Sequence, residues 1–254
     1  MSFIPGQDIF DKRSELNQPL NAVLALATMF VAALVAVATF RWLDGWFIGS
    51  TLVSQVIVIG AGQVIVAQMI LRRHAFRARW GDRAFSIAFR WLAIPGLTLV
   101  FVGVAHFAWI EGARVVPHEI ALIPTLYLVV SGVLLWLRAI FVFGMDNLSL
   151  MYVYFPKESR LVNSNVYSVV RHPVYSGVLR VIFAIALWNG SAFALIAVCI
   201  APPAMTPWLR WVEESELIER FGDRYREYRQ RVPAFFNLNP RTWFVLWRFL
   251  VTGR

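Results

Sequence analysis

The chain has 254 residues, of which 59% are hydrophobic and only 15% charged, and its mean hydropathy is +0.61. This is far more apolar than a soluble domain of that length and predicts an all-α, polytopic membrane protein. The net charge of +9 does not indicate nucleic-acid binding, because the Lys and Arg residues gather in short segments beside apolar runs. Such segments are typical of topology signals and anionic-lipid contacts. Cys199 is the single cysteine, which excludes an intrachain disulfide and a metal site built from several cysteines.

A membrane-spanning helix needs about 20 apolar residues, and four runs of that length fill the first half of the chain. They are Leu20–Phe40, Phe47–Leu71, Phe89–Ile110 and Ile120–Phe143. We take residues 1–144 as an N-terminal four-span region. The polar stretch 2–17 has no apolar signal-peptide core, so the first run is expected to remain as an anchor. Glycines and glutamines of the second run and His106 of the third are expected to serve helix packing.

Residues 145–254 form the second predicted region, in which we expect the chemistry of the protein to lie. Residues 145–170 are expected to be a polar loop with short helical or extended pieces. A helical hairpin should follow, with arms 173–188 and 192–211, because a Trp-Asn-Gly-Ser turn signal divides one long apolar stretch. Three prolines in the second arm, Pro202, Pro203 and Pro207, are expected to kink or interrupt it.

Two charged or amphipathic helices are predicted after the hairpin. The first covers residues 213–231, with a break at Phe221-Gly222 where Asp223 can cap a new helix. The second, residues 241–250, has the pattern of an amphipathic interfacial helix. The chain is therefore expected to cross the membrane about six times.

Arginines between the second and third spans predict the orientation. Six arginines and one acid lie within residues 71–90, so the positive-inside rule makes that segment cytoplasmic. Alternation of the spans then places both termini, the polar loop and residues 213–231 on the cytoplasmic side. The two most polar segments of the second half are thus expected to form one site.

The first of these segments contains Arg171-His172-Pro173-Val174-Tyr175-Ser176-Gly177. Pro173 suits the first position of a helix and favours an extended His172 before it. The N-terminus of that helix favours an anion such as a carboxylate. A purely structural role, with Arg171 at lipid phosphates and His172 as a helix-start residue, is the alternative.

The second segment contains Arg210-Trp211-Val212-Glu213-Glu214. Two adjacent acids at the membrane exit of a helix are costly to bury without a cation. Either neighbouring arginines neutralise Glu213 and Glu214, or a cationic ligand does. A surface helix with ion pairs is the alternative.

Together the two segments resemble the isoprenylcysteine carboxyl methyltransferase family of integral membrane methyltransferases, which includes phospholipid N-methyltransferase relatives. The resemblance covers about Leu161–Phe236 and rests on the Arg-His-Pro-x-Tyr-x-Gly loop, the hairpin and the Glu-Glu pair followed by Phe-Gly. The chain departs from the family pattern at Asn165, where a glycine is usual. Because Asn tolerates a left-handed backbone, the turn can survive.

The resemblance implies that S-adenosylmethionine binds in a cytoplasm-facing pocket. The residues implied to line it are His172, Pro173, Tyr175 and Gly177 on one side, Glu213 and Glu214 on the other, and Leu161 and Val162 through backbone and apolar contacts. Arg210 matches a basic position expected to help hold the acceptor. A carboxylate acceptor needs no base, whereas an amine or thiol would require one, with His172 or Glu214 as candidates. No residues with metal-ligand spacing are found.

Several alternatives stay open from the sequence. The acceptor is lipidic or hydrophobic, and an isoprenylcysteine carboxylate, a phospholipid amine, a small thiol or an isoprenoid-like acid would all suit it. A membrane NADPH-dependent sterol or isoprenoid reductase is a second hypothesis, since such enzymes carry a related Arg-His-Pro-x-Tyr loop. A non-catalytic lipid-binding or assembly factor is a third. Arg138 and Arg180, both inside predicted helices, can either snorkel or turn toward the pocket, and nothing indicates the oligomeric state.

Overall fold

A computed structural model describes residues 19–144, 149–237 and 239–253. The polar N-terminal stretch and residues 145–148 of the predicted loop lie outside these ranges. The described part of the chain is helical and contains no strand, only an isolated bridge between Arg114 and Ser191. The predicted all-α class is confirmed.

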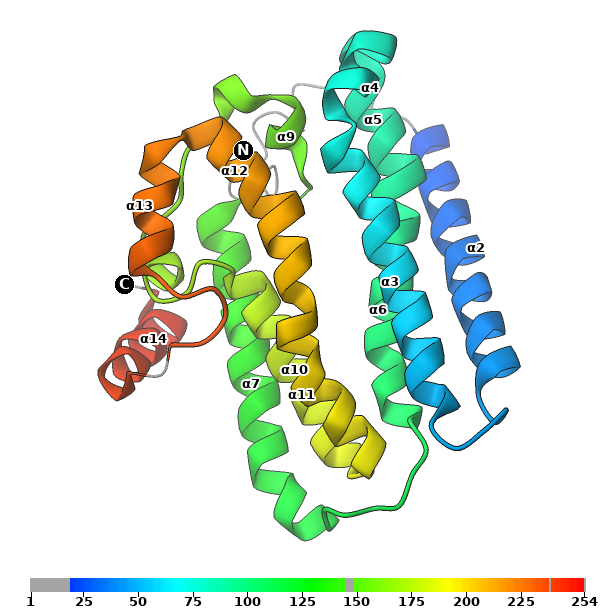
Figure 1. Ribbon diagram of the computed structural model, residues 1–254. Coiled ribbons are helices and arrows are strands. Elements are labelled where there is room, and N and C mark those ends of the chain that lie inside the picture. Colours follow the sequence, from blue (N-terminus) through cyan, green and yellow to red (C-terminus); the bar gives the residue numbers. More distant parts are fainter. Residues whose placement is uncertain (1–18, 145–148, 238, 254) are drawn as a thin grey trace.

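Twelve α-helices make up most of the described residues. They are α2 (Pro19–Leu43), α3 (Ser50–Leu71), α4 (Arg73–Trp80), α5 (Ala84–Ala88), α6 (Ile94–His106), α7 (His118–Phe143), α9 (Met151–Tyr154), α10 (Pro173–Asn189), α11 (Ala192–Trp208), α12 (Glu214–Phe221), α13 (Asp223–Arg231) and α14 (Pro240–Thr252) (Figure 1). Within the described ranges, five helical stretches are long and apolar enough to cross a bilayer, and α10 is a shorter apolar helix beside them. The chain is an integral membrane protein.

The long helices form two neighbouring groups (Figure 1). Helices α2, α3 and α6 pack on one another, whereas α7 makes its most extensive contact with α10, which also packs on α11. Glycine allows the closest approach in each group. A Cβ atom added to Gly62 of α3 would lie 2.6 Å from the carbonyl oxygen of Gly96 in α6, so the predicted packing role of the second-span glycines applies at Gly62. Gly60 has no neighbour within 4 Å of such an atom.

A buried polar cluster joins α2, α3 and α6 near the α2–α3 connection. His106 Nδ1 lies 2.9 Å from Gln55 Oε1, and His106 Nε2 lies 2.8 Å from Asp44 Oδ2. The Phe40 ring stacks on the imidazole at a centroid distance of 3.6 Å. These contacts confirm that His106 is a hydrogen-bonded packing residue.

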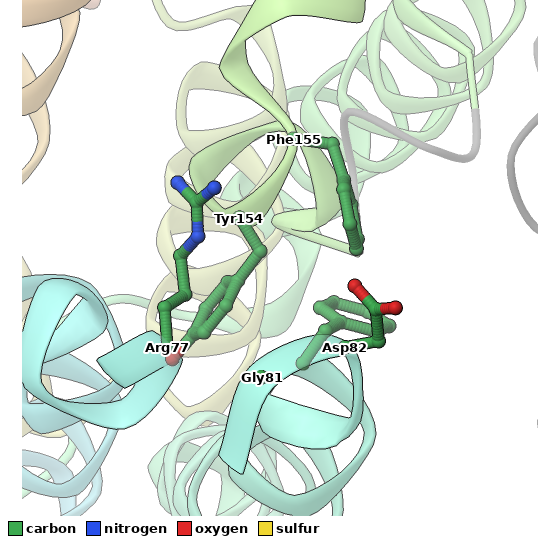
Figure 2. Close-up of a pocket in the computed structure, with 6 residues that line it drawn as sticks. Arg77, Gly81, Asp82, Tyr154 and Phe155 are labelled. Carbon is green, nitrogen blue, oxygen red and sulfur yellow. The ribbon is translucent and has the colours of Figure 1, made fainter. Parts of the chain in front are cut away.

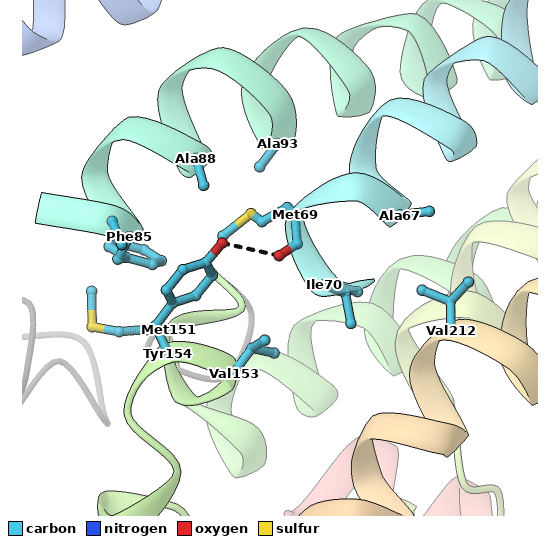
Figure 3. Close-up of a cluster of buried hydrophobic side chains, with 11 residues drawn as sticks. Ala67, Met69, Ile70, Phe85, Ala88, Ala93, Met151, Val153, Tyr154 and Val212 are labelled. Atoms are coloured by element: carbon cyan, nitrogen blue, oxygen red, sulfur yellow. Dashed lines mark hydrogen bonds between the residues drawn. The ribbon is translucent and has the colours of Figure 1, made fainter. Parts of the chain in front are cut away.

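The opposite end of the bundle carries the polar segments. There a buried apolar cluster joins α3, α5 and α9, and the Tyr154 hydroxyl donates a hydrogen bond to the Met69 carbonyl oxygen at 2.9 Å (Figure 3). Val212 belongs to the same cluster, and an ion pair between Arg73 of α4 and Glu219 of α12 adds a polar contact. The basic segment 71–90 and the Glu213–Glu214 segment therefore lie at one end of the molecule.

The second arm of the hairpin, whose prolines were predicted to kink or interrupt it, is a continuous helix. Helix α11 is not interrupted by Pro202, Pro203 or Pro207, and it continues through a π-helical segment, Leu209–Glu213, into α12. Proline removes backbone N–H donors, but helices packed in a membrane protein tolerate that loss. A second π-helical segment, Phe89–Ala93, precedes α6. The break at Gly222 is confirmed, with a φ angle of +59° there, although Asp223 is the first residue of α13 and its side chain makes no capping hydrogen bond.

Candidate active site

His172 lies directly before α10, in the loop that precedes this helix. Pro173 is the first residue of α10, as predicted. His172 is not helical, but with φ −121° and ψ 67° it does not have the extended conformation that was predicted for it. The His172 N–H donates to the Ala234 carbonyl oxygen at 3.0 Å, and the Arg171 N–H donates to that of Pro233 at 2.9 Å. These two backbone hydrogen bonds hold the loop in place.

The segment 233–235 was not among the predicted site residues. Besides the two backbone hydrogen bonds above, its Phe235 carbonyl oxygen accepts a hydrogen bond from Ser176 Oγ at 2.6 Å. The segment therefore covers the start of α10 from the loop side. The sequence predicted that the preceding helix ends at residue 231 and that the resemblance extends to Phe236, but neither prediction gave this segment a partner.

Glu213 and Glu214 come directly from the π-helical turn at the end of α11. The Glu214 N–H donates to the Leu209 carbonyl oxygen, which is the i to i+5 spacing of a π-helix. Such single wide turns inside α-helices are frequent at functional sites. The turn ends at Glu213, and both carboxylates reach His172 of the preceding loop.

The His172 imidazole lies between the two carboxylates. Its Nδ1 is 3.2 Å from Glu213 Oε1, and its Nε2 is 3.2 Å from Glu214 Oε1. A neutral imidazole has one N–H, so only the protonated ring can donate to both acids. Burial lowers the pKa of His172, but the carboxylates of Glu213 and Glu214 outweigh burial and raise it to about 8. The two carboxylates therefore favour the protonated, cationic form of His172.

Glu214 is the more enclosed of the two acids, with a side chain 3% exposed. Its Oε1 accepts from Arg171 Nη2 at 2.8 Å and from the Tyr225 hydroxyl at 3.3 Å. Arg229 of α13 approaches Oε2 at 3.5 Å. Glu214, the first residue of α12, thus connects this helix to the His172 loop and to α13, and its contacts indicate a structural role.

Glu213 is more open, with a side chain 25% exposed. Besides His172, its carboxylate accepts a hydrogen bond from the Tyr175 hydroxyl at 2.7 Å. Trp208 Nε1 in turn donates to that hydroxyl at 3.2 Å. Of the two acids, Glu213 is therefore the one that a ligand can reach, and Tyr175 is the aromatic ring beside it.

Gly177 has a packing role that the sequence did not reveal. A Cβ atom added there would lie 2.8 Å from the Gly132 carbonyl oxygen of α7, so the glycine allows α7 and α10 to touch. Pro173 is buried at the start of the same helix. The structure thus gives Gly177 a contact with α7, and its lining of a cofactor pocket stays a prediction.

The side chains joined around His172, which we call the His172 cluster, are those of Arg171, His172, Tyr175, Trp208, Glu213, Glu214, Tyr225 and Arg229. The structure does not bring Arg210 into this cluster. The side chain is exposed, and among the described residues it forms no ion pair. Its carbonyl oxygen accepts a hydrogen bond from Ser215 Oγ at 2.7 Å. Arg210 belongs to the π-helical segment Leu209–Glu213, so α-helical spacing does not describe the directions in which Arg210 and Glu214 point.

Leu161 and Val162 line a cavity of about 220 Å³, together with Arg160 and residues 163–164 of the same loop and Val142 of α7. Neither His172 nor either carboxylate lines that cavity. A second cavity, of about 270 Å³, lies between the α4–α5 turn and α9, where Arg77 and Asp82 flank Tyr154 and Phe155 (Figure 2). It contains none of the predicted site residues.

Asn165 adopts the left-handed backbone conformation that was expected of it, with φ +55°. Its Oδ1 accepts from the Val166 N–H at 2.8 Å, and its Nδ2 donates to the Gly253 carbonyl oxygen at 2.9 Å. The residue therefore connects the loop to the end of α14. A glycine could supply the backbone shape but not these hydrogen bonds.

Arg138 and Arg180 lie away from the two carboxylates. Arg138 Nε donates to the Leu250 carbonyl oxygen at 3.4 Å, near the C-terminus of α14, where a cation is favoured. Arg180 Nη1 donates to Ser176 Oγ at 2.9 Å, one turn earlier in α10. Neither side chain forms an ion pair with Glu213 or Glu214.

The region that contains this site matches a known family. The model of the phospholipid methyltransferase family matches residues 120–224, from the first turn of α7 into α13. The second half of this chain resembles phospholipid methyltransferases. This match confirms the resemblance to membrane methyltransferases that was predicted from the two motifs. All the residues of the His172 cluster named above, except Tyr225 and Arg229, lie within it.

A curated relative supports the same assignment. Over 71 residues the chain is 39% identical to Methanethiol S-methyltransferase 1 of Bradyrhizobium diazoefficiens, a match that covers 26% of this chain and 22% of the relative. No solved structure matches the chain. Both comparisons point to a methyltransferase.

Proposed function

We propose that the protein is an S-adenosylmethionine-dependent methyltransferase that acts on a lipidic or hydrophobic acceptor in the membrane. The observation that carries this proposal is the contact of His172 with both Glu213 and Glu214, inside the region that matches the phospholipid methyltransferase family. A buried group of charges that includes one accessible carboxylate is suited to a small cationic ligand.

The chemistry of the cluster fits S-adenosylmethionine, which supplies a methyl group activated by a sulfonium when it is bound. The open carboxylate of Glu213 can accept hydrogen bonds from an ammonium, and the Tyr175 ring beside it can stabilise a cation. Glu214 holds this arrangement in place through Arg171 and Tyr225.

The protonation of His172 bears on the acceptor. An imidazolium whose two N–H groups both face carboxylates cannot take a further proton, so His172 is not a general base at neutral pH. The cluster therefore favours an acceptor that arrives as an anion, and a carboxylate needs no base at all. Carboxyl O-methylation, most like that of isoprenylcysteine, is the acceptor chemistry that we propose.

Methylation of a thiol is the second candidate. It is favoured by the similarity to a methanethiol S-methyltransferase, and a thiolate would also arrive as an anion. Amine methylation is less suited to a protonated His172. Neither comparison points to a reductase.

We place the site on the cytoplasmic side. Six arginines of residues 71–90 lie at the same end of the bundle as α12, where Arg73 pairs with Glu219. The positive-inside rule supports a cytoplasmic position for that end. The orientation is tested by introducing a single cysteine either into α13 or into the 110–117 loop and labelling intact cells with a membrane-impermeant thiol reagent. The cysteine in the loop should react and the cysteine in α13 should not. The reverse pattern would overturn the orientation.

Binding of the cofactor is the direct test of the function. Purified protein in nanodiscs is expected to bind S-adenosylmethionine in calorimetry, and Glu213→Gln should weaken binding by about tenfold or more, since hydrogen bonds to a charged group are worth about 1.5–3 kcal/mol. Glu227→Gln, at an exposed position of α13, is the matched control. Unchanged binding in both Glu213→Gln and His172→Gln would remove this cluster as the cofactor site.

The acceptor is then identified by product analysis. Membranes incubated with methyl-labelled S-adenosylmethionine should yield a labelled methyl ester, which alkaline hydrolysis releases as methanol. A labelled thioether or amine, stable to that treatment, would instead identify S- or N-methylation and overturn the carboxylate proposal.

A further inference from the structure

Arg180 lies two helical turns into α10, and no acidic partner is found for it among the described residues. Its Nη1 donates one hydrogen bond, to Ser176 Oγ at 2.9 Å, and its guanidinium carbon lies 5.9 Å from the centre of the Phe236 ring. The Tyr127 side chain of α7 is within electrostatic reach. Within residues 19–144, 149–237 and 239–253, no carboxylate lies within 4.0 Å of Arg180.

Three other enclosed arginines are neutralised by carboxylates, whereas the half-buried Arg90 and Arg138 donate to Asn21 Oδ1 and to the Leu250 carbonyl oxygen. Arg73 pairs with Glu219, Arg171 with Glu214, and Arg220 with Glu216. A guanidinium carries five N–H donors and stays charged, and a charged side chain within an apolar helix is costly unless it finds an anion or reaches the interface. Among the described residues, Arg180 is therefore a partly buried cation that donates one side-chain hydrogen bond and pairs with no carboxylate, in a mostly apolar helix whose other polar side chains are Tyr175, Ser176 and Asn189.

The surroundings of Arg180 are aromatic and open toward the outside of the bundle. Tyr127 is 48% exposed, and its ring lies 5.8 Å from that of Trp247 in α14. Phe236, the other ring near the guanidinium, is 37% exposed. An anionic group bound at Arg180 would thus be flanked by apolar rings, which suits a molecule with a charged head and a hydrocarbon chain.

The position of Arg180 relates it to the candidate active site. It follows His172 by eight residues, which corresponds to about 12 Å along a helix axis. Ser176, which accepts its hydrogen bond, donates in turn to the Phe235 carbonyl oxygen of the segment that covers the His172 loop. A ligand at Arg180 would therefore lie beside the methyl-transfer site but would not occupy it.

We propose that Arg180, with Ser176, Tyr127 and Phe236, binds the anionic group of an amphipathic molecule whose apolar part lies in the bilayer. The group is a phosphate or a carboxylate, both of which a guanidinium binds through paired N–H donors. The identity of this molecule as the methyl acceptor rests on the proposed function, whereas the anion site itself does not. Arg180 then favours acidic over zwitterionic amphiphiles.

The experiment is native mass spectrometry of the full-length protein in detergent. Phosphatidylglycerol and phosphatidylcholine with identical acyl chains are added in equal amounts, and inorganic phosphate is added in a separate arm. Wild-type protein is expected to retain phosphatidylglycerol in preference. In Arg180→Gln the ratio of retained phosphatidylglycerol to retained phosphatidylcholine should fall about tenfold, which corresponds to the loss of one charge-assisted hydrogen bond. Arg180→Lys should keep part of it, and Arg248→Gln, at an exposed arginine of α14, should keep all of it.

Equal retention of the two lipids by wild-type protein would overturn the proposal, and this comparison needs no variant to fold. Loss of the preference in Arg248→Gln but not in Arg180→Gln would overturn the assignment to Arg180. Tight binding of inorganic phosphate, together with no preference between the two lipids, would overturn the proposal that the ligand is an amphipathic molecule. S-adenosylmethionine binding is measured on the same samples, so that failure of the proposed function is seen separately: a protein that binds phosphatidylglycerol through Arg180 but no methyl donor keeps the anion site and loses the enzyme.

Discussion

His172 Nδ1 and Glu213 Oε1 lie 3.2 Å apart although 41 residues separate them in the chain. The hairpin of α10 and α11 accounts for this, because it returns the chain from the N-terminus of α10 to the same level of the bundle. The two polar segments thus form one cluster, in which a cation is held between two acids. Each prediction below tests one consequence of such a contact.

Glu214→Ala is expected to destabilise the protein more than Glu213→Ala. Removing one partner of a buried ion pair costs about 3–5 kcal/mol, because the remaining charge is left without compensation, and Glu214 is only 3% exposed beside Arg171. Glu213 is more open and should cost less in stability while affecting ligand binding more. Thermal unfolding in detergent, paired with S-adenosylmethionine binding, separates the two effects. Equal loss of stability in both variants would contradict the distinction between them.

Stability should fall as the pH rises through about 8. The pKa of His172 is raised from its ordinary value of 6.5 to about 8 in the folded protein, so its contribution is fully present below pH 6.5 and is lost as the ring deprotonates through its folded pKa. The shift corresponds to about 2 kcal/mol. The melting temperature between pH 6 and 9 should drop in wild type, and this component should be absent in His172→Gln. The same slope in both would show that another group titrates.

Gly177→Ala should push α7 and α10 apart. A Cβ atom at this position would lie 2.8 Å from the Gly132 carbonyl oxygen, and backbone on both sides leaves no flexible atom to move. Overpacking of this kind costs about 1–3 kcal/mol. Gly60→Ala on α3 is the matched control, because nothing lies within 4 Å of its added Cβ atom, and it should leave the melting temperature unchanged or raise it. If both variants melted alike, the close contact of α7 and α10 would be refuted.

Asn165→Val should destabilise the loop, whereas Asn165→Gly should be milder. The left-handed conformation at φ +55° costs about 1–2 kcal/mol for an ordinary side chain and is worse for a branched one. Glycine keeps the backbone and loses only the hydrogen bonds to Val166 and Gly253. Melting temperatures of the two variants give the comparison, and a valine variant as stable as wild type would contradict the assigned backbone.

The sequence predicted the membrane class, the helical hairpin and both motif segments. These features are local: a run of about 20 apolar residues is a span in any context, and Pro173 begins a helix wherever the chain places it. The left-handed Asn165 was also predictable, because its conformation depends on residue type and on the glycine that the family has there. The uninterrupted α11 was not, since tolerance of its prolines depends on packing against neighbouring helices.

The tertiary structure decided the direction of each side chain. Glu213 and Glu214 are adjacent in the sequence, yet a π-helical turn and the arginines of other segments make one accessible and enclose the other. The same three-dimensional packing leaves Arg210 on the surface and gives Arg180 no acidic partner among the described residues. The physical reason is that a charge's environment is set by residues 40 or more positions away, such as Glu213 and Glu214 around His172, and spacing within one segment carries no information about them.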